Sequence, residues 1–243
     1  MNNQEKKVAI LQSNYIPWKG YFDLINTVDE FIFYDDVQFT KNDWRNRNKI
    51  KTSHGVQWLT IPVKHESLSQ KVKDTVIADP KWNRKHWSAI VTNYSKASYF
   101  KHYKEIFEEL YANVSSKYLS EVNYIFIKKI HETLNINTKF NWSSNFELIG
   151  DKTERLVRVC KEVRAAEYYT GPSARGYIDE ELFYKEGIKV KYMDYSNYPE
   201  YKQLYDAFIH EVSILDLIFN EGPHATKYMK SFLALGLKKA CSS

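Results

Sequence analysis

The sequence predicts an α/β protein with a doubly wound, mostly parallel sheet. In Lys7–Phe39 an apolar strand, a polar turn, a helical stretch and a second apolar strand follow one another. They do so within roughly thirty residues, the minimum length of a parallel crossover unit. Strands and helices alternate again after residue 137, beyond a long helical stretch. Such alternation is typical of a sheet with helices on both faces.

The elements at the start of the chain follow from their apolar patterns. Val8–Leu11 and Glu30–Tyr34 are short apolar runs that indicate buried strands, and Tyr21–Val28 between them has the apolar spacing of a helix. A basic turn is expected at Thr40–Thr52, followed by a strand at Trp58–Val63. This order brings polar residues to the ends of the first two strands.

The middle of the chain is predicted to be helical. In Asn83–Leu134 the apolar residues Val122, Phe126, Ile130 and Leu134 recur every four positions, which is the spacing of one helix face. We expect two or three helices here, inserted as a layer into the α/β protein.

Sheet character returns after this insertion. The expected elements are a strand at Lys139–Trp142, a helix from the capping box Asp151-x-x-Glu154 to about Val163, a strand at Glu167–Thr170, a helix at Tyr177–Glu186, a strand at Lys189–Tyr195 and a helical region at Val212–Leu237. The chain thus divides into an α/β nucleotide-binding core (residues 1–82 and 138–200), a helical insertion (83–137) and a C-terminal helical segment (201–243).

The composition limits the class of protein. The 243 residues contain no run of about 18 apolar side chains, the length that a membrane-spanning helix needs. The first residues lack the apolar core of a signal peptide, and two cysteines are too few for a disulfide framework. We therefore expect a cytoplasmic protein without a membrane span. The net charge of +5 permits phosphorylated ligands or RNA without requiring them.

Polar residues after the first strand are candidates for a ligand site. Ligands of parallel sheets bind beyond the carboxyl ends of the strands, where helix N-termini present free N–H groups. A glycine here allows a tight turn or a close approach to a ligand, a lysine can meet a phosphate, and amides can read hydroxyls or a base edge. A simple proline-led turn is the alternative. The candidates are Gln12, Asn14, Tyr15, Trp18, Lys19, Gly20 and Tyr21.

Two carboxylates and an amide, Asp35, Asp36 and Gln38, follow the second strand. Adjacent carboxylates at a strand end can bind a metal, a ribose or an amine, and one of them can act as a general base. Because successive strand residues point to opposite faces, only one aspartate would line a given site. A solvated strand end is the alternative.

The basic turn combines cations, amides and an indole ring. This combination suits a nucleotide diphosphate or an RNA backbone, although a charge run is more often a solvated surface. Its candidates are Asn42, Trp44, Arg45, Asn46, Asn48 and Lys49. His86 is a further candidate base, and Ser173 and Arg175 belong to a turn that can bind an anion. The seven histidines have no spacing typical of metal ligands, so no metal is expected.

Several stretches match a known family. QSNYIPWKGYFDLINTVDEFIFYDDVQFTKNDWRNRNKI resembles the signature of the WbqC-like family, and further matching stretches are GVQWLTIPV, KWNRKHW, KTERL, YYTGPSARGYID and SILDLIFNEG. The resemblance covers nearly the whole chain. It implies a place among the bacterial gene clusters for surface polysaccharide (O-antigen) synthesis, and it does not imply a particular reaction.

The first motif is also similar to the nucleotidyltransferase-like fold of pantothenate synthetases and cytidylyltransferases. The shared features are a strand, a P-x-x-G-[HY] turn, a helix and a strand ending in IFYDDVQF. Those enzymes bind ATP or CTP with an H-x-G-H motif. Its histidine positions correspond to Trp18 and Tyr21 here, which cannot supply a cationic imidazole. Lys19 or the cluster Arg45–Lys51 would have to hold the phosphates instead.

Together these features predict an N-acyltransferase or ligase that forms an amide, for example N-glycyl, on the amino group of a nucleotide-linked amino sugar. The cofactor stays open between ATP and an aminoacyl donor, and the donor partner between an aminoacyl-tRNA and an acyl carrier. Arg45, Lys49 and Lys19 would hold phosphates, and Trp18 or Trp44 would stack on a base or sugar. Because an ammonium is no nucleophile, a base must take its proton. The candidates for that base are Asp35, Asp36 and His86.

Two alternatives belong to other classes. A metal-dependent glycosyltransferase, or another nucleotide-sugar-modifying enzyme, would use Asp35 and Asp36 as a diphosphate and metal site. A non-catalytic module would bind a nucleotide sugar or RNA without turning it over.

Overall fold

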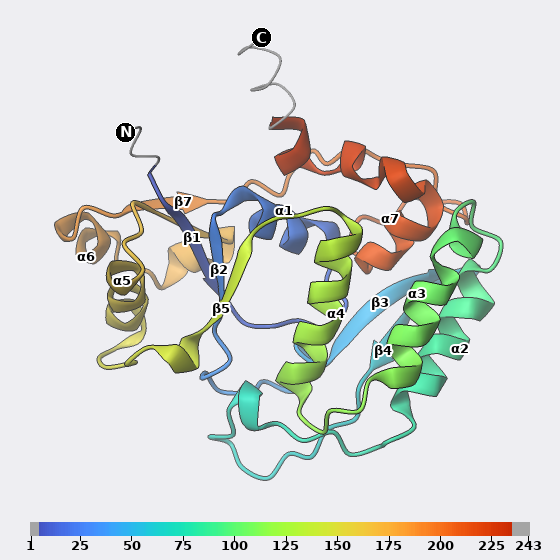
Figure 1. The fold of residues 1–243 in the computed structure, drawn as a ribbon, viewed down its shortest axis with the longest axis horizontal. Helices are drawn as coiled ribbons and strands as arrows, with labels where there is room; N and C mark the ends of the chain where they lie inside the picture. The colour runs from blue at the N-terminus through green and yellow to red at the C-terminus, as the bar shows by residue number, and fades with distance from the viewer. Residues whose placement is uncertain (1–4, 235–243) are drawn as a thin grey trace.

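The structure, a computed structural model, describes residues 5–234. Its centre is a five-stranded sheet in the order β5-β2-β1-β6-β7, with every pair of neighbours parallel (Figure 1). The strands are β1 Lys7–Leu11, β2 Glu30–Phe33, β5 Lys139–Trp142, β6 Glu167–Thr170 and β7 Lys189–Tyr192. The chain passes from β1 through β2 to β5, then returns to the other side of β1. The predicted doubly wound α/β fold is confirmed.

Helices cover both faces of the sheet and continue beside it (Figure 1). They are α1 Lys19–Thr27, α2 Trp82–Tyr94, α3 Phe100–Asn113, α4 Leu119–Thr133, α5 Lys152–Glu162, α6 Glu180–Lys185 and α7 Ile214–Glu221. The capping box predicted at Asp151 and Glu154 opens α5. Helix α6 is shorter than predicted because Asp179, and not Tyr177, caps its first turn.

Alternate residues of the central strands face two separate cores. Ala9 of β1 and Phe31 of β2 lie in the larger core, whereas Val8 and Ile10 lie in the smaller one. The larger core is closed by α1, α7 and the inserted helices α2, α3 and α4, and the smaller core by α5 and α6. Because neighbouring strand residues point to opposite faces, the continuous apolar runs of β1 and β2 correspond to burial on both sides.

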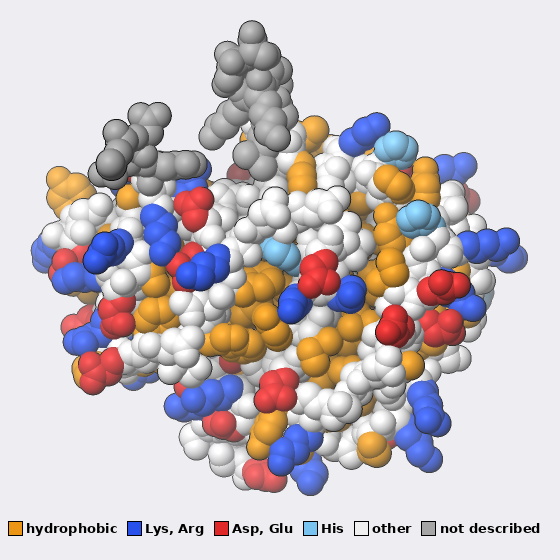
Figure 2. Space-filling model, in the orientation of Figure 1, with side chains coloured by type: hydrophobic (Ala, Val, Ile, Leu, Met, Phe, Trp, Pro, Cys, Tyr) orange, Lys and Arg blue, Asp and Glu red, His pale blue; other side chains and the backbone are white. Residues whose placement is uncertain are grey.

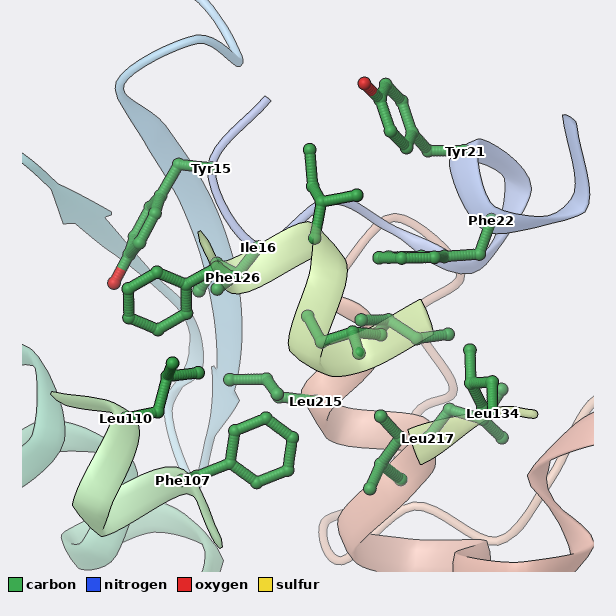
Figure 3. Packing of buried hydrophobic residues seen from close by; sticks show 14 of the residues in the cluster. Tyr15, Ile16, Tyr21, Phe22, Phe107, Leu110, Phe126, Leu134, Leu215 and Leu217 are labelled. Carbon is green, nitrogen blue, oxygen red and sulfur yellow. The ribbon is translucent and has the colours of Figure 1, made fainter. Parts of the chain in front are cut away.

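The inserted helices share the larger core with the sheet. Phe107 of α3, Phe126 of α4 and Leu215 of α7 meet there, close to Tyr15 and Ile16 of the loop after β1 (Figure 3). The rings of Tyr15 and Phe126 are 5.5 Å apart and nearly perpendicular, an arrangement that aromatic pairs prefer. The insertion therefore supports the loop that follows β1.

A β-hairpin replaces the second half of the predicted basic turn, from Arg47 on. β3 Arg47–Thr52 pairs antiparallel with β4 Gly55–Thr60, apart from the main sheet. The turn between the strands depends on Gly55, whose φ of 108° favours glycine. The prediction of a turn throughout Thr40–Thr52 was wrong. The inward-facing residues of β3 include Asn48, and a polar residue at a buried position interrupts the alternation of apolar and polar residues by which a strand is recognised.

The segment 193–213 contains neither helix nor strand. The predicted C-terminal helical segment (201–243) is therefore wrong for residues 201–213, and residues 235–243 lie outside the described part of the chain. Buried polar side chains hold this segment in place of backbone pairing. Lys51 of β3, 1% exposed, donates to Gln203 Oε1 (2.7 Å) and to the carbonyls of Tyr205 (2.6 Å) and Ala207 (2.8 Å). The carboxylate of Asp216 accepts from Gln203 Nε2 (3.0 Å) on the other side.

No helix among the described residues is long and apolar enough to cross a membrane. On the face drawn in Figure 2, acidic and basic side chains are interspersed around exposed apolar groups. This face therefore offers no extended patch of one charge.

We predict that Lys51→Met lowers the free energy of unfolding by about 2–4 kcal/mol, because it leaves three oxygens that accept from the ammonium without their donor. Lys64→Met makes the same change at an exposed position and should cost less than about 0.5 kcal/mol. Urea denaturation followed by circular dichroism measures both. Equal stability of the two variants would contradict a supporting role for Lys51.

Candidate functional site

A cavity of about 530 Å³ opens at the carboxyl end of the sheet. Four segments form its walls: the loop after β1, the start of the hairpin, the segment after β7 and the residues just before α7. The lining residues are Asn14, Pro17, Trp18, Trp44, Asn48, Tyr195, Asn197, Tyr198, His210 and Glu211. Its volume is within the range of small-molecule sites, which are concave, aromatic and equipped with a few polar groups.

Distant residues fix the backbone of the loop after β1. The Ser13 N–H donates to Asp35 Oδ1 (2.8 Å), and the Tyr15 N–H donates to the Trp44 carbonyl (3.0 Å). Asn48 Nδ2 donates to the carbonyls of Tyr15 (3.1 Å) and Ile16 (3.0 Å). Ile16 has a φ of 35°, which is strained for a β-branched residue. The amide of Asn48 thus holds the strained turn that presents Asn14 and Trp18 to the cavity.

Aromatic rings build one side of the cavity. The Trp18 indole contacts the rings of Tyr195 (5.2 Å between centroids) and Tyr198 (5.7 Å), in both cases edge to face. A Cβ added at Gly20 would lie 2.3 Å from the Trp18 ring. The absence of a side chain at Gly20 therefore makes room for this indole, and Gly20 itself lies buried in α1.

His210 and Glu211 are the imidazole and the carboxylate that line the cavity. Burial, followed by the positive charge of Lys19, lowers the pKa of His210, so its imidazole is neutral near pH 7. Glu211 lies 3.6 Å from the ammonium of Lys49. Sequence reasoning missed both residues. The one available signal was the length of the irregular segment before α7, since long loops without secondary structure are often functional.

Of the residues predicted for the site, Asn14, Trp18, Trp44 and Asn48 line the cavity. Lys49 lies beside it through its contact with Glu211.

Lys19 does not face the cavity as a phosphate ligand. It is 3% exposed, its Nζ donates to the Pro199 carbonyl (3.0 Å), and it lies 4.9 Å from the ring centre of Tyr198 and 5.2 Å from that of Tyr201. Burial lowers its pKa to about 8. The predicted phosphate-binding role of Lys19 is therefore corrected: the ammonium anchors the segment after β7 from beneath.

Asp35 is 1% exposed and has both carboxylate oxygens engaged by the fold. One accepts from the Ser13 N–H and the other from the Ser120 hydroxyl of α4. Burial raises its pKa, although the hydrogen bonds from Ser120 and Ser13 oppose the rise. This carboxylate joins β2 to the loop after β1 and to the insertion, and it is absent from the cavity lining.

Asp36 occupies different surroundings from its neighbour. It pairs with Lys73 and Lys71 and accepts from the Ser143 hydroxyl (2.8 Å). Burial alone would raise its pKa, but the hydrogen bond and charge of Lys73 bring it below the ordinary value. Gln38, close by, donates to the Leu68 carbonyl. Among the described residues no cluster of three or more histidine, cysteine, aspartate or glutamate side chains is arranged to hold a metal ion.

His86 belongs to a buried hydrogen-bond chain. Its Nε2 contacts the Thr60 carbonyl (3.1 Å), which only accepts, so Nε2 carries the proton and Nδ1 accepts from the Tyr15 hydroxyl (2.9 Å). Tyr15 in turn accepts from Tyr111 (2.7 Å). Burial lowers the pKa of His86 to about 4. The chain links the loop after β1 with the hairpin and the insertion, away from the cavity lining.

The remaining predicted residues form contacts within the protein and lie outside the cavity lining. Tyr21 donates to the Gln12 carbonyl (2.9 Å) and Asn46 to the Ile61 carbonyl (3.0 Å). Arg45 pairs with Asp43, and the Asn42 carbonyl accepts from Arg47. Arg175, on a 3-10 turn that also contains Ser173, lies 3.9 Å from the ring centre of Tyr192. None of these residues lines the cavity.

We predict that protonation of His86 destabilises the protein below neutral pH. The folded-state pKa of about 4 lies below the ordinary value of 6.5, so the unfolded chain binds the proton more tightly. The contribution of His86 to the free energy of unfolding is therefore fully present above pH 6.5. It decreases by about 3 kcal/mol as the pH falls toward 4. Denaturation curves of the wild type and His86→Gln between pH 4 and 7 isolate this contribution, because only the wild type should have it. His54→Gln, exposed in the hairpin turn, should keep the wild-type slope.

Comparisons with known proteins assign the chain to a family. A family model described as the WbqC-like protein family matches residues 12–228. The chain is also 48% identical over 226 residues to "Uncharacterized protein Rv1507c" of Mycobacterium tuberculosis, covering 93% of this chain and 98% of that protein. No solved structure matches the chain. The chain belongs to the WbqC-like protein family.

Proposed function

We propose that this protein is an enzyme that forms an amide on the amino group of a nucleotide-linked amino sugar, in the synthesis of a bacterial surface glycan. One observation carries the proposal: a neutral imidazole and a carboxylate, His210 and Glu211, adjoin in a cavity that also contains aromatic rings and amides. The role of base, expected of Asp35, Asp36 or His86, passes in this proposal to His210.

The cavity has groups suited to a sugar nucleotide. The indoles of Trp18 and Trp44 offer faces for a base or a sugar. Asn14 makes no side-chain hydrogen bond to any residue in the described range, so its amide is available to a ligand. The amide of Asn48, in contrast, is committed to Tyr15, Ile16 and the Lys49 N–H. Asn48 therefore shapes the cavity, and Asn14 and Asn197 are the amides that would read hydroxyls.

The proposed chemistry begins with an amine that is protonated in water. The carboxylate of Glu211 attracts the ammonium, and His210, neutral because its pKa is lowered, takes its proton. The free amine then attacks the carbonyl carbon of an activated acyl group. A C–N bond forms, the bond from that carbon to the leaving group breaks with its electron pair going to the leaving group, and the amide nitrogen releases its second proton to solvent.

The glycosyltransferase alternative relies on Asp35 and Asp36 as a shared diphosphate and metal site. Asp35 is buried against Ser13 and Ser120, and Asp36 is paired with Lys73. Two carboxylates with separate partners do not favour a shared site, so we favour amide formation. A non-catalytic binding module would use the same cavity. It differs from the proposed enzyme because it would bind its ligand without forming a product.

We predict that His210→Gln reduces amide formation at least about a hundredfold, the usual contribution of a general base, and changes ligand affinity less than threefold. Binding is measured by thermal shift and calorimetry with UDP- and dTDP-linked amino sugars, and turnover with the ligand that binds. The wild-type rate should fall with decreasing pH as the imidazole becomes protonated.

His102→Gln, exposed on α3, is the matched control and should retain full activity. A fully active His210→Gln enzyme would exclude His210 as the base. Binding without product for any acyl donor would instead favour the non-catalytic module.

A further inference from the structure

The positive charge of this protein is concentrated around one hairpin. Residues 40–60 contain five lysines and arginines and one aspartate, a formal charge of +4, whereas the whole chain carries +5. Two of these cations are committed: Lys51 is buried in hydrogen bonds to the segment before α7, and Arg45 is paired with Asp43. Of the other three, Lys41 is exposed before the hairpin, and Arg47 and Lys49 lie on the outer face of the hairpin.

Two tryptophans lie with these cations on the same face. Trp44 and Trp58 are 40% and 39% exposed, with ring centres 5.4 Å apart. The Arg47 guanidinium lies 4.2 Å from the Trp58 ring centre, and the Lys49 ammonium lies 5.3 Å from that ring and 5.5 Å from the Trp44 ring. We call these four residues, Trp44, Arg47, Lys49 and Trp58, the tryptophan platform.

The strand register explains why the platform exists. Lys49 is opposite Trp58 and Arg47 opposite Thr60, so these side chains project from one face of the hairpin. Ile50 and Leu59 project from the other face into the core. Because Ile50 and Leu59 are buried in the core, the side chains of Arg47, Lys49 and Trp58 lie on the outer face of the hairpin.

The platform cations are available to a phosphate. Within the described range Arg47 has no carboxylate within ion-pair distance, and its guanidinium donates to the Asn42 carbonyl. Lys49 has a single carboxylate neighbour, Glu211, at 3.6 Å, and that glutamate is largely exposed. Exposed pairs of this kind contribute little to stability, so a phosphate can replace the carboxylate.

Exposed rings interleaved with cations are the means by which proteins bind single-stranded nucleic acids, because bases stack on the rings while phosphates meet the cations. Trp44 belongs both to the platform and to the cavity lining. A strand that crosses Trp58 and Trp44 would therefore bring its end to His210 and Glu211.

We propose that the tryptophan platform binds the unpaired 3′ end of an RNA, and that an aminoacyl-tRNA is the acyl donor. The RNA-binding part stands on the platform alone, whereas the donor role rests on the proposed function. In the transfer step the amine attacks the carbonyl carbon of the aminoacyl ester, a C–N bond forms and the C–O bond to the terminal ribose breaks. The ribose oxygen keeps the electron pair and receives the proton that His210 took from the amine.

Fluorescence anisotropy with deacylated tRNA tests the binding. The wild type should bind a tRNA with an intact 3′ end at least tenfold more tightly than the same tRNA trimmed to its base-paired stem. The double variant Arg47→Gln/Lys49→Gln and the single variant Trp58→Ala should each weaken binding to intact tRNA about tenfold. The control Lys101→Gln/Lys128→Gln removes two exposed charges from α3 and α4 and should stay within twofold of the wild type.

Equal effects of the two double variants, or equal binding of intact and trimmed tRNA, would contradict RNA binding by the tryptophan platform. Circular dichroism and the affinity for the nucleotide sugar verify that each variant is folded. Amide formation from a small thioester donor, together with no tRNA binding, would refute the platform and leave the proposed function standing. Specific tRNA binding without amide formation from aminoacyl-tRNA would support the platform and refute the donor role.

Discussion

The loop after β1 is buried without regular secondary structure, and the rest of the structure depends on how its backbone polar groups are satisfied. A buried N–H or carbonyl without a partner costs as much as a lost hydrogen bond, so each needs a group from elsewhere. Asp35 supplies one acceptor and Asn48 donates twice, to Tyr15 and Ile16. These contacts join the sheet to the hairpin. The second carboxylate oxygen of Asp35 accepts from Ser120 and so connects α4 to the same loop. The geometry of the cavity follows from this loop.

A second part of the cavity wall is held in the same way by a second buried network. The segment 193–213 forms neither helix nor strand. Backbone hydrogen bonds fix its two ends, and between them Lys51 and Asp216 hold it through its own Gln203. Fully satisfied polar networks make a fold specific, whereas partly satisfied ones are costly. His210 and Glu211 belong to this segment. Both walls of the cavity are thus irregular in backbone and yet determined by buried side chains, which suits a site that must be organised before its ligand arrives.

This arrangement explains which of the predicted site residues line the cavity and which lie elsewhere. Asn14, Trp18, Trp44 and Asn48, predicted because they follow a strand or belong to the aromatic and basic stretch, line the cavity. Lys19 and Asp35 have the same polar character and comparable positions in the sequence, but they are turned inward and serve as anchors. A polar residue at the end of a strand can bind a substrate, or it can form hydrogen bonds to the protein's own backbone. Sequence pattern does not distinguish these uses, since both place it at the same position.

The sequence by itself determined the doubly wound α/β fold, the buried strands β1 and β2 and the capping box of α5, because these depend on residues close together in the chain. Only the tertiary structure decided that Arg47–Thr52 is a strand, that residues 201–213 are irregular, and that His210 and Glu211 face the cavity. These features depend on partners far away in sequence: Lys51 meets Gln203 across 152 positions, and Asp35 meets Ser120 across 85. Local periodicity contains no information about such pairs, and their hydrogen bonds, not propensity, set the conformation there.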